Sequence, residues 1–322
     1  MRLALLLFLP ALFAADPWRA AMDDGNYNLA EEQLKKVLAE AENQDALADL
    51  ALIYRTQGRF TDAEPVLLRL VATYPENSSA AASAMTDLAE NYRAMGQPLK
   101  AQPILSSVIS IHRRPPAASD VEMARDLHRL AEVFVDLEQA PQAIQMFVQS
   151  LDLASPKLGR IHPDLLPSLD ALGALYRNDG HYAEAEGIYR WSLTIRERQF
   201  GHKHSELIPT IDNLSYVLFG QKKYKEADPY YDRLLELWET NVGLDHPMVA
   251  LTLDKMAEFY FAQDRISDAE CAAERALKIR EAGYQQSVRR MAKILTVENR
   301  TEEAAALLKR TGIQKTREAP KN

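Results

Sequence analysis

Eight alanines recur along the chain at nearly constant spacing, and they constrain its fold more than any other feature. Four consecutive intervals of this row measure 42 residues, and the remaining three measure 33, 38 and 35. A period on this scale indicates a stack of repeated supersecondary units rather than one folded globule. The row consists of Ala30, Ala63, Ala101, Ala143, Ala185, Ala227, Ala269 and Ala304.

A second row of small residues lies twelve positions before these alanines, from Ala63 onward. Two helices approach closely only where both carry small side chains at the crossing. Each pair therefore predicts a helix A that crosses a helix B. Large apolar residues flank the second row in steps of three and four, which places them on one helical face as core. They run from Leu47, Leu50 and Tyr54 to Val288, Met291 and Leu295. The second row is Ala51, Ala89, Ala131, Gly173, Ser215, Ala257 and Ala292.

The turn between the paired helices carries its own signals. Glycine follows several of the predicted helices A, at Gly58, Gly96 and Gly180. An acidic residue commonly precedes the anchor alanine, where a carboxylate complements the dipole at the start of helix B. These residues are Asp62, Glu184, Glu226, Asp268 and Glu303. The combined spacing predicts an array of α-hairpins.

The hairpins resemble tetratricopeptide repeats (TPR). One 34-residue unit carries the pattern in Leu50, Ala51, Tyr54, Gly58, Phe60, Ala63 and Pro75. Residues 121–280 resemble the 42-residue variant of kinesin light chains and many bacterial proteins, whose linker often reads Gly-x-x-His-Pro. Residues 159–163 and 243–247 match that linker, and residues 201–205 depart from it at the proline. The resemblance implies an all-α solenoid of TPR helix hairpins that forms a right-handed superhelix, binds peptides or proteins on its concave side and has no activity.

The first fifteen residues have the pattern of a signal peptide. Arg2 supplies a positive start, residues 3–13 form a short apolar run, and Ala14 and Ala15 offer small residues for cleavage. We therefore expect an exported protein, periplasmic or extracellular after cleavage, with no membrane span in the mature chain. The alternative is an uncleaved N-terminal helix.

Changes in the repeat interval predict the organisation of the rest of the chain. We expect N-terminal TPR-like repeats at 16–112, one of them truncated, and a regular 42-residue array at 121–284. A closing helix hairpin at 285–310 and a polar tail at 311–322 follow. The segment 113–120 contains Pro115 and Pro116, which cannot continue a helix. We interpret it as a Pro-rich inter-repeat loop rather than a hinge, because the alanine interval across it remains 42 residues.

Charge and cysteine content narrow the class of partner. The 46 acidic and 38 basic side chains give a formal net charge of −8, which argues against nucleic acid as a partner. Cys271 is the only cysteine, so no intrachain disulfide can form. Its place two residues after an anchor alanine predicts a small packing residue rather than a nucleophile.

Residues with catalytic or metal-binding spacing are missing from the sequence. It contains no phosphate-binding glycine loop, no His-Glu-x-x-His and no Gly-x-Ser-x-Gly. His162, His204 and His246 occupy the same place in successive repeats, too far apart to share one ion. We interpret them as helix-start residues. We expect no catalytic residue, no cofactor and no metal site, although His202 and His204 leave open a surface metal pair.

A row of aspartates marks the surface of helix A that does not face helix B. Asp170, Asp212 and Asp254 recur at intervals of 42 residues. The resemblance places such positions in the peptide groove, and Asn213 matches the asparagine that kinesin light chain-type repeats use toward a peptide backbone. The alternative is that aspartate near the start of a helix only complements its dipole. The peptide-groove candidates are Asp170, Arg177, Asp212, Asn213, Tyr216, Phe219, Asp254, Lys255, Glu258 and Phe261.

These patterns predict an exported, non-enzymatic adaptor or scaffold that binds a protein or peptide segment in its concave groove. We expect the groove to be acidic with aromatic ends, and to favour a partner segment with Lys or Arg beside an apolar side chain. A structural subunit of an envelope or secretion assembly is the first alternative. An enzyme with an unrecognised site is the second, and it requires a deep pocket with converging polar groups.

Overall fold

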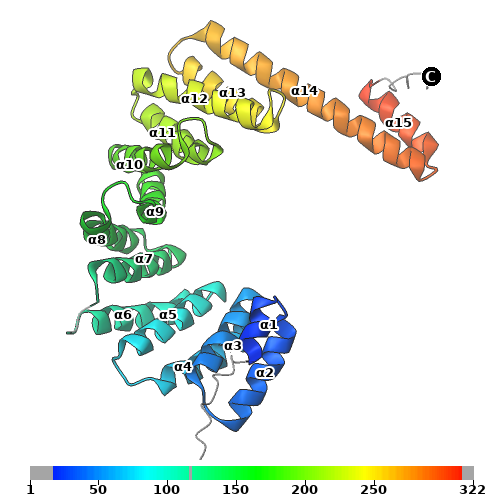
Figure 1. Cartoon of the computed structure of the whole chain (residues 1–322). Coiled ribbons are helices and arrows are strands. Elements are labelled where there is room, and N and C mark those ends of the chain that lie inside the picture. Colours follow the sequence, from blue (N-terminus) through cyan, green and yellow to red (C-terminus); the bar gives the residue numbers. More distant parts are fainter. Residues whose placement is uncertain (1–16, 116–117, 314–322) are drawn as a thin grey trace, which may run out of the picture. The chain divides into compact units, whose positions relative to one another are not determined.

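The computed structural model describes residues 17–115 and 118–313, and the chain divides into two compact units between Arg160 and Ile161 (Figure 1). The described residues form fifteen α-helices and two short 3-10 helices, with no strand among them. The predicted signal peptide at 1–15 and residues 314–322 of the predicted tail lie outside the described residues. The division falls inside the predicted regular array, at the linker after Gly159, and not at the loop 113–120.

The first unit consists of four helix hairpins. Its first hairpin has a helix A of only 7 residues, which agrees with the predicted truncated repeat. Trp18 stands twelve positions before Ala30, where later repeats have a small residue, and its buried indole donates a hydrogen bond to Asp49. The helices are α1 (Pro17–Asp23), α2 (Tyr27–Glu40), α3 (Gln44–Thr56), α4 (Phe60–Thr73), α5 (Ser79–Ala94), α6 (Pro98–His112), α7 (Asp120–Asp136) and α8 (Ala140–Leu158).

The second unit continues the same pattern with longer helices B. The helices are α9 (Leu166–Asn178), α10 (Tyr182–Phe200), α11 (Ile208–Gly220), α12 (Tyr224–Val242), α13 (Pro247–Phe261), α14 (Ile266–Val297) and α15 (Thr301–Thr311). The 3-10 helices Pro163–Leu165 and Ser205–Leu207 precede α9 and α11. Helix α8 of the first unit and helices α10 and α12 of the second are each 19 residues long, and this length accounts for the 42-residue intervals from Ala143 to Ala269. The interval from Ala101 to Ala143 instead spans the 15-residue α6, the segment 113–119 and α7.

The anchor alanines lie where the sequence predicts them. All eight are buried near the start of a helix B. The small residues twelve positions earlier are buried as well, except Ala257, which is half-buried. The flanking large residues form the core with one clear exception, Met291, whose residue is 53% exposed. The prediction that Cys271 packs in the core is also wrong, because it lies on an exposed face of α14.

A left-handed residue ends every helix A, five positions before each anchor alanine. Gly25, Gly58, Gly96 and Gly180 have positive φ angles at this place, and so do Glu138, Lys222, Asp264 and Asn299. The next residue donates a backbone hydrogen bond across the turn, as Lys223 does to Leu218 at 2.9 Å. This arrangement is the Schellman-type helix ending, in which glycine avoids the strain that a side chain causes.

Lys222 is therefore a strained residue in a place that glycine fits. We expect Lys222→Gly to raise the free energy of unfolding by about 0.5–1 kcal/mol, because relief of the left-handed strain outweighs the larger entropy of an unfolded glycine. Gly180→Ala makes the opposite change at the equivalent turn and should lower it by about 1 kcal/mol. Urea unfolding followed by circular dichroism measures both, and a lower midpoint for Lys222→Gly would contradict the expectation.

The linker histidines act as helix-start residues, as predicted. The Nδ1 atoms of His162, His204 and His246 each accept a hydrogen bond from the backbone N–H two residues later, at 3.2 Å in all three cases. Proline follows His162 and His246 directly. The proline fixes the backbone for the first helical turn and needs no hydrogen-bond partner for its nitrogen.

The segment 113–120 connects two helices that pack on each other. Helix α7 begins after Ser119, whose side chain forms a capping box with Glu122. Below the loop, His112 Nδ1 lies 2.5 Å from the carboxylate of Asp126, which is almost fully buried. This contact joins the end of α6 to α7. The described residues of the segment thus connect two helices that pack on each other.

A cluster around Glu31 joins the first three full-length helices. The carboxylate accepts hydrogen bonds from Arg59 at 2.7 Å, Lys35 at 2.6 Å and the Tyr54 hydroxyl at 3.1 Å. The hydrogen bond from Arg59 is the main reason that the pKa of Glu31 falls from 4.5 to about 2, against the opposing effect of burial. The cluster therefore favours the ionised carboxylate.

Because of this pKa shift, the free energy of unfolding of the first unit depends on pH in the acid range. A pKa that is lower in the folded state stabilises the protein above about pH 4.5, and the contribution is lost as the pH falls toward about 2. We expect Glu31→Gln to lower the free energy of unfolding by about 1–2 kcal/mol at pH 7 and by nothing near pH 2. Denaturant midpoints of both proteins across this range test it. A difference that does not change with pH would show that Glu31 acts by packing alone.

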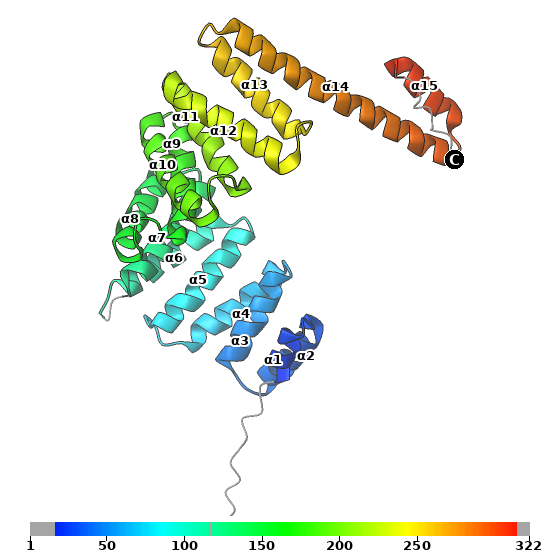
Figure 2. The ribbon, with the colours of Figure 1, turned by 45° about the horizontal axis from the view of Figure 1, so that its top comes forward.

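The predicted boundary between the regular array and the closing hairpin is not a helix boundary. Helix α14 runs without interruption through residues 284 and 285 for 32 residues. Gly283 weakens the helix but does not end it, because its backbone is not left-handed and no proline follows it in α14. The closing hairpin therefore consists of the distal part of α14 and α15 (Figure 2).

Candidate functional site

The predicted groove residues of the second unit lie on the helix A surface, which we define as the side of α9, α11 and α13 that carries the candidate side chains. Polar contacts connect successive helices along this surface. Arg177 of α9 donates to the Oδ1 atom of Asn213 on α11. Asp212 of α11 accepts from Lys255 Nζ on α13, at 2.6 and 2.8 Å. The structure thus brings Arg177, Asp212, Asn213 and Lys255 together as one ladder.

The three aspartates of the row are neutralised by cations from the protein itself. Asp170 accepts hydrogen bonds from Ser192 at 2.8 Å and from Arg196 at 2.5 Å. Asp212 pairs with Lys255, and Asp254 pairs with Arg280 of α14. The row therefore supplies no unpaired carboxylate, and the acidic groove stays a prediction. That prediction treated each carboxylate as unpaired, since a single sequence does not show that residues 26 or 43 positions later supply a cation.

The aromatic candidates are the exposed part of this surface. Tyr216 is 50% exposed and Phe261 is 69% exposed, whereas Phe219 is half-buried against Phe259 with ring centroids 6.0 Å apart. The ring of Tyr182 meets Tyr216 edge-on at 6.0 Å. This edge-on contact restricts the Tyr216 ring, while half of the residue stays exposed.

Glu258 is the charged candidate without a partner. Its side chain is exposed on α13 and forms no ion pair with any residue in the described part of the chain. It occupies the position in α13 that Tyr216 occupies in α11, 42 residues earlier. Burial of Tyr231 raises the pKa of that phenol, and the charges of Asp212 and Glu258 raise it further.

Ion pairs also connect successive helices A of the first unit, α3, α5 and α7. Arg55 donates to Asp87 and Glu90, each at 2.6 Å, and Arg129 donates to the other oxygen of Glu90 at 2.9 Å. Arg93 binds Glu132 and Asp136, each at 2.7 Å. The mixed charges that the sequence places on these helices are thus paired from one repeat to the next.

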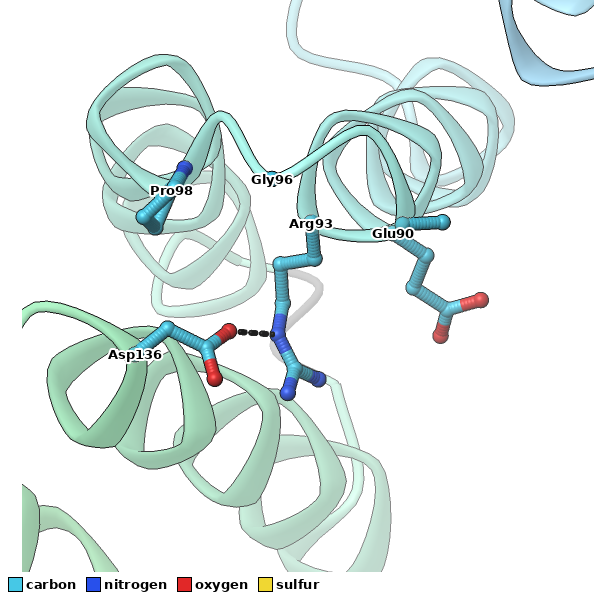
Figure 3. Close-up of a pocket in the computed structure, with 6 residues that line it drawn as sticks. Glu90, Arg93, Gly96, Pro98 and Asp136 are labelled. Atoms are coloured by element: carbon cyan, nitrogen blue, oxygen red, sulfur yellow. Dashed lines mark hydrogen bonds and ion pairs between the residues drawn. The ribbon is translucent and has the colours of Figure 1, made fainter.

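A recess of about 600 Å³ lies beside Arg93 in the first unit (Figure 3). Glu90, Gly96, Pro98 and Asp136 contribute to its wall. Burial opposes the charge on Arg93, but the hydrogen bonds and charges of Asp136 and Glu132 outweigh it and raise the pKa of the guanidinium. Within the recess Arg93 binds Asp136, whereas Glu90 binds Arg55 and Arg129 of the neighbouring helices A.

Metal ligation finds no support in the described residues. Across 17–115 and 118–313, no three His, Cys, Asp or Glu side chains are arranged to hold an ion. His202 contacts Glu197 at 3.3 Å, and His204 uses its Nδ1 for the helix cap. No helix within these ranges is long and apolar enough to cross a bilayer.

Family models match the chain along both units. A tetratricopeptide repeat model matches residues 122–198 and 207–282, and a second tetratricopeptide repeat model matches residues 21–88. The chain belongs to the tetratricopeptide repeat family. The ladder and the exposed aromatics lie on consecutive TPR helices A, and the matched segments include every groove candidate of the second unit. No curated protein sequence matches the chain significantly.

Solved structures of TPR proteins share the fold at low sequence identity. A Podosopora anserina protein of nearly identical kinesin light chain TPR-like repeats is 19% identical with a TM-score of 0.54, over 64% of this chain and 98% of that one. BtubC (BKLC) from P. vanneervenii is 16% identical with a TM-score of 0.56, over 71% and 91%. The C-terminal part of a TPR protein from Cytophaga hutchinsonii is 18% identical with a TM-score of 0.54, over 83% and 95%. These structures support an all-α solenoid of kinesin light chain-like helical hairpins.

Proposed function

We propose that this TPR protein is an exported, non-enzymatic adaptor that captures a segment of a partner protein on the helix A surface of its second unit. The observation that carries the proposal is the group formed by Tyr216, Glu258 and Phe261. Two exposed aromatic rings and one unpaired carboxylate stand there on adjacent helices, beside the ion pair of Asp212 and Lys255. TPR scaffolds generally bind proteins, and this group supplies contacts that a peptide can use.

The chemistry of the group favours a partner segment with a basic side chain beside an apolar one. Glu258 can accept hydrogen bonds from Lys or Arg, and the tyrosine ring adds a cation–π contact at the same place. The Phe261 ring can cover the neighbouring apolar side chain. The amide nitrogen of Asn213 donates no hydrogen bond within the described residues, which leaves it for a carbonyl of the bound backbone.

A charge reversal at Glu258 tests the electrostatic part of the proposal. Random peptides displayed on phage and selected on the purified chain should be enriched in Lys or Arg beside apolar residues. We expect Glu258→Lys to weaken the selected peptide about tenfold or more, because the cation then meets a like charge. Fluorescence anisotropy with a labelled synthetic peptide measures the change.

Glu206→Lys is the matched control, since it reverses an exposed glutamate of the same unit at the start of a 3-10 helix. It should leave the affinity unchanged. If both variants bind the peptide equally weakly, the effect comes from the net charge of the protein and not from Glu258. If Glu258→Lys binds the peptide as the wild type does, Glu258 is not part of the site. Reversal of Asp212 is a poorer test, because it would also leave Lys255 without its partner.

Export is the second part of the proposal and rests on residues 1–15. If the segment is a signal peptide, the chain should be recovered outside the cytoplasm, with its N-terminus at Ala15 or Asp16. Cell fractionation with mass determination of the intact protein tests this. Uncleaved protein found only in the cytoplasm would overturn the periplasmic or extracellular location.

A further inference from the structure

In the second unit, helix α14 does not pack against a following helix A as the earlier helices B do. In α10, α12 and α14 a leucine stands on helix B eight positions after the anchor alanine. Leu193 on α10 is buried there, and Leu235 on α12 packs partly buried against the same core. The equivalent residue on α14 is Leu277, which is 55% exposed. Leu277 is exposed because α14 continues as one helix, so no separate helix A follows to pack on it.

The residues that would form the helix A side of this interface are also exposed, and they lie farther along α14. Leu214 and Met256 stand one position before the small residue of their helices A and are buried. The equivalent residue before Ala292 is the exposed Met291. Ile294, two positions after Ala292, is 47% exposed, although Phe259 at the equivalent place in α13 is fully buried. The distal part of α14 therefore carries an uncovered helix A face.

The two halves cannot meet within one chain while α14 remains a helix. Residues 277 and 291 lie about 21 Å apart along its axis, at 1.5 Å per residue. In both ribbon views α15 packs at the far end of α14, away from α13 (Figures 1 and 2). Residues 280–287 are helical and exposed throughout, so a fold-back would have to break this helix.

We propose that two copies of the chain form a symmetric dimer through antiparallel α14 helices. Leu277, Tyr284 and Met291 are spaced by seven residues, which places them on one face of the helix. An antiparallel pair centred on Tyr284 sets Leu277 opposite Met291 of the partner subunit, and the two-fold axis repeats the contact. Leu277 stands at the repeat position of Leu193, and Met291 stands at the repeat position of Leu214. Each contact of the dimer therefore joins these two repeat positions. The dimer continues the interface that the array uses between its own repeats.

Charged substitutions at the two halves test the dimer. Size-exclusion chromatography with light scattering should give twice the chain mass for the wild type. Leu277→Glu and Met291→Lys should each give the monomer mass, because each buries a charge opposite an apolar side chain twice. A mixture of the two variants should recover a dimer, since Glu at 277 then faces Lys at 291 of the other chain. Leu99→Glu changes an exposed leucine of α6 and should remain dimeric.

Disulfide trapping distinguishes a contact between copies from a fold-back. In a Cys271→Ser background, Tyr284→Cys should form a covalent dimer on mild oxidation, because this position faces itself across the two-fold axis. The double variant Leu277→Cys/Met291→Cys should link two chains. A bond within one chain in that variant would overturn the proposal in favour of a broken helix. A wild-type chain that stays monomeric up to about 100 μM would also overturn it.

Discussion

Replacing Gly173 with alanine is expected to lower the free energy of unfolding by about 2 kcal/mol. Alanine is the natural residue at the equivalent position of several other repeats, including Ala51, Ala89 and Ala131. The difference lies in the ring of Tyr189, which packs directly on Gly173. A β-carbon added to Gly173 would lie 2.7 Å from Cε1 of that ring, well inside van der Waals contact.

The placement of the side chain sixteen positions later, and not its size alone, makes the difference. Ala131 and Ser215 stand at the equivalent positions before the buried Phe147 and Tyr231, whereas the buried ring of Tyr189 lies directly against Gly173. Tyr189 has no room to retreat, since its side chain is almost completely buried. Because the ring is rigid and the core is closely packed, the added methyl group would strain the structure.

A double-mutant cycle separates this clash from any other effect. Tyr189→Leu creates room, and it also removes a buried hydroxyl that has no hydrogen-bond partner among the described residues. The double variant Gly173→Ala/Tyr189→Leu should therefore be more stable than the sum of the single changes by about 1 kcal/mol or more. Urea unfolding followed by circular dichroism supplies the four midpoints.

Gly187→Ala is the control on the same hairpin. Gly187 lies within α10, and a β-carbon there would meet nothing within 4 Å. Its replacement should raise the free energy of unfolding by about 0.5–1 kcal/mol through helix propensity. The two glycine-to-alanine changes are thus expected to have opposite signs. Equal effects would mean that the Tyr189 ring gives way and that the crossing is not closely packed.

The repeats could be predicted from the sequence because the residues that recur are those that pack at each helix crossing. Ala30, Ala185 and Ala304 are buried as expected, since a helix crossing admits few side chains. Glycine at the end of helix A was visible in only some repeats. Lys222 and Asp264 have the same left-handed backbone, because the hydrogen bonds of the turn outweigh the strain of a side chain.

The site was less predictable because its chemistry depends on contacts between distant residues. The positions of Asp170, Asp212 and Asp254 on successive helices A followed from the 42-residue interval. Their cations follow the interval only in part. Arg196 and Arg280 lie on helices B, 26 residues after Asp170 and Asp254, but Trp238 stands at that place for Asp212, which pairs with Lys255 of the next helix A instead. The continuity of α14 was also hidden, because Gly283 is compatible with either a helix or a turn.

Removing both exposed rings from the helix A surface is expected to weaken peptide binding about 100-fold. Each buried aromatic contact in a binding site contributes about 1–2 kcal/mol, and two such contacts on neighbouring helices multiply in affinity. Tyr216→Ala and Phe261→Ala should each weaken the selected peptide about tenfold, and the double variant should show the product. Fluorescence anisotropy at constant salt measures all three against the wild type.

The stability of the double variant should remain close to that of the wild type, because both rings are largely exposed and the core residue Phe259 stays in place. Tyr27→Ala removes an exposed ring from α2 in the first unit and should leave the affinity unchanged. Full affinity in the double variant would place the peptide elsewhere on the solenoid. A loss in Tyr216→Ala without one in Phe261→Ala would confine the contact to α11 and to the support that Tyr182 gives its ring.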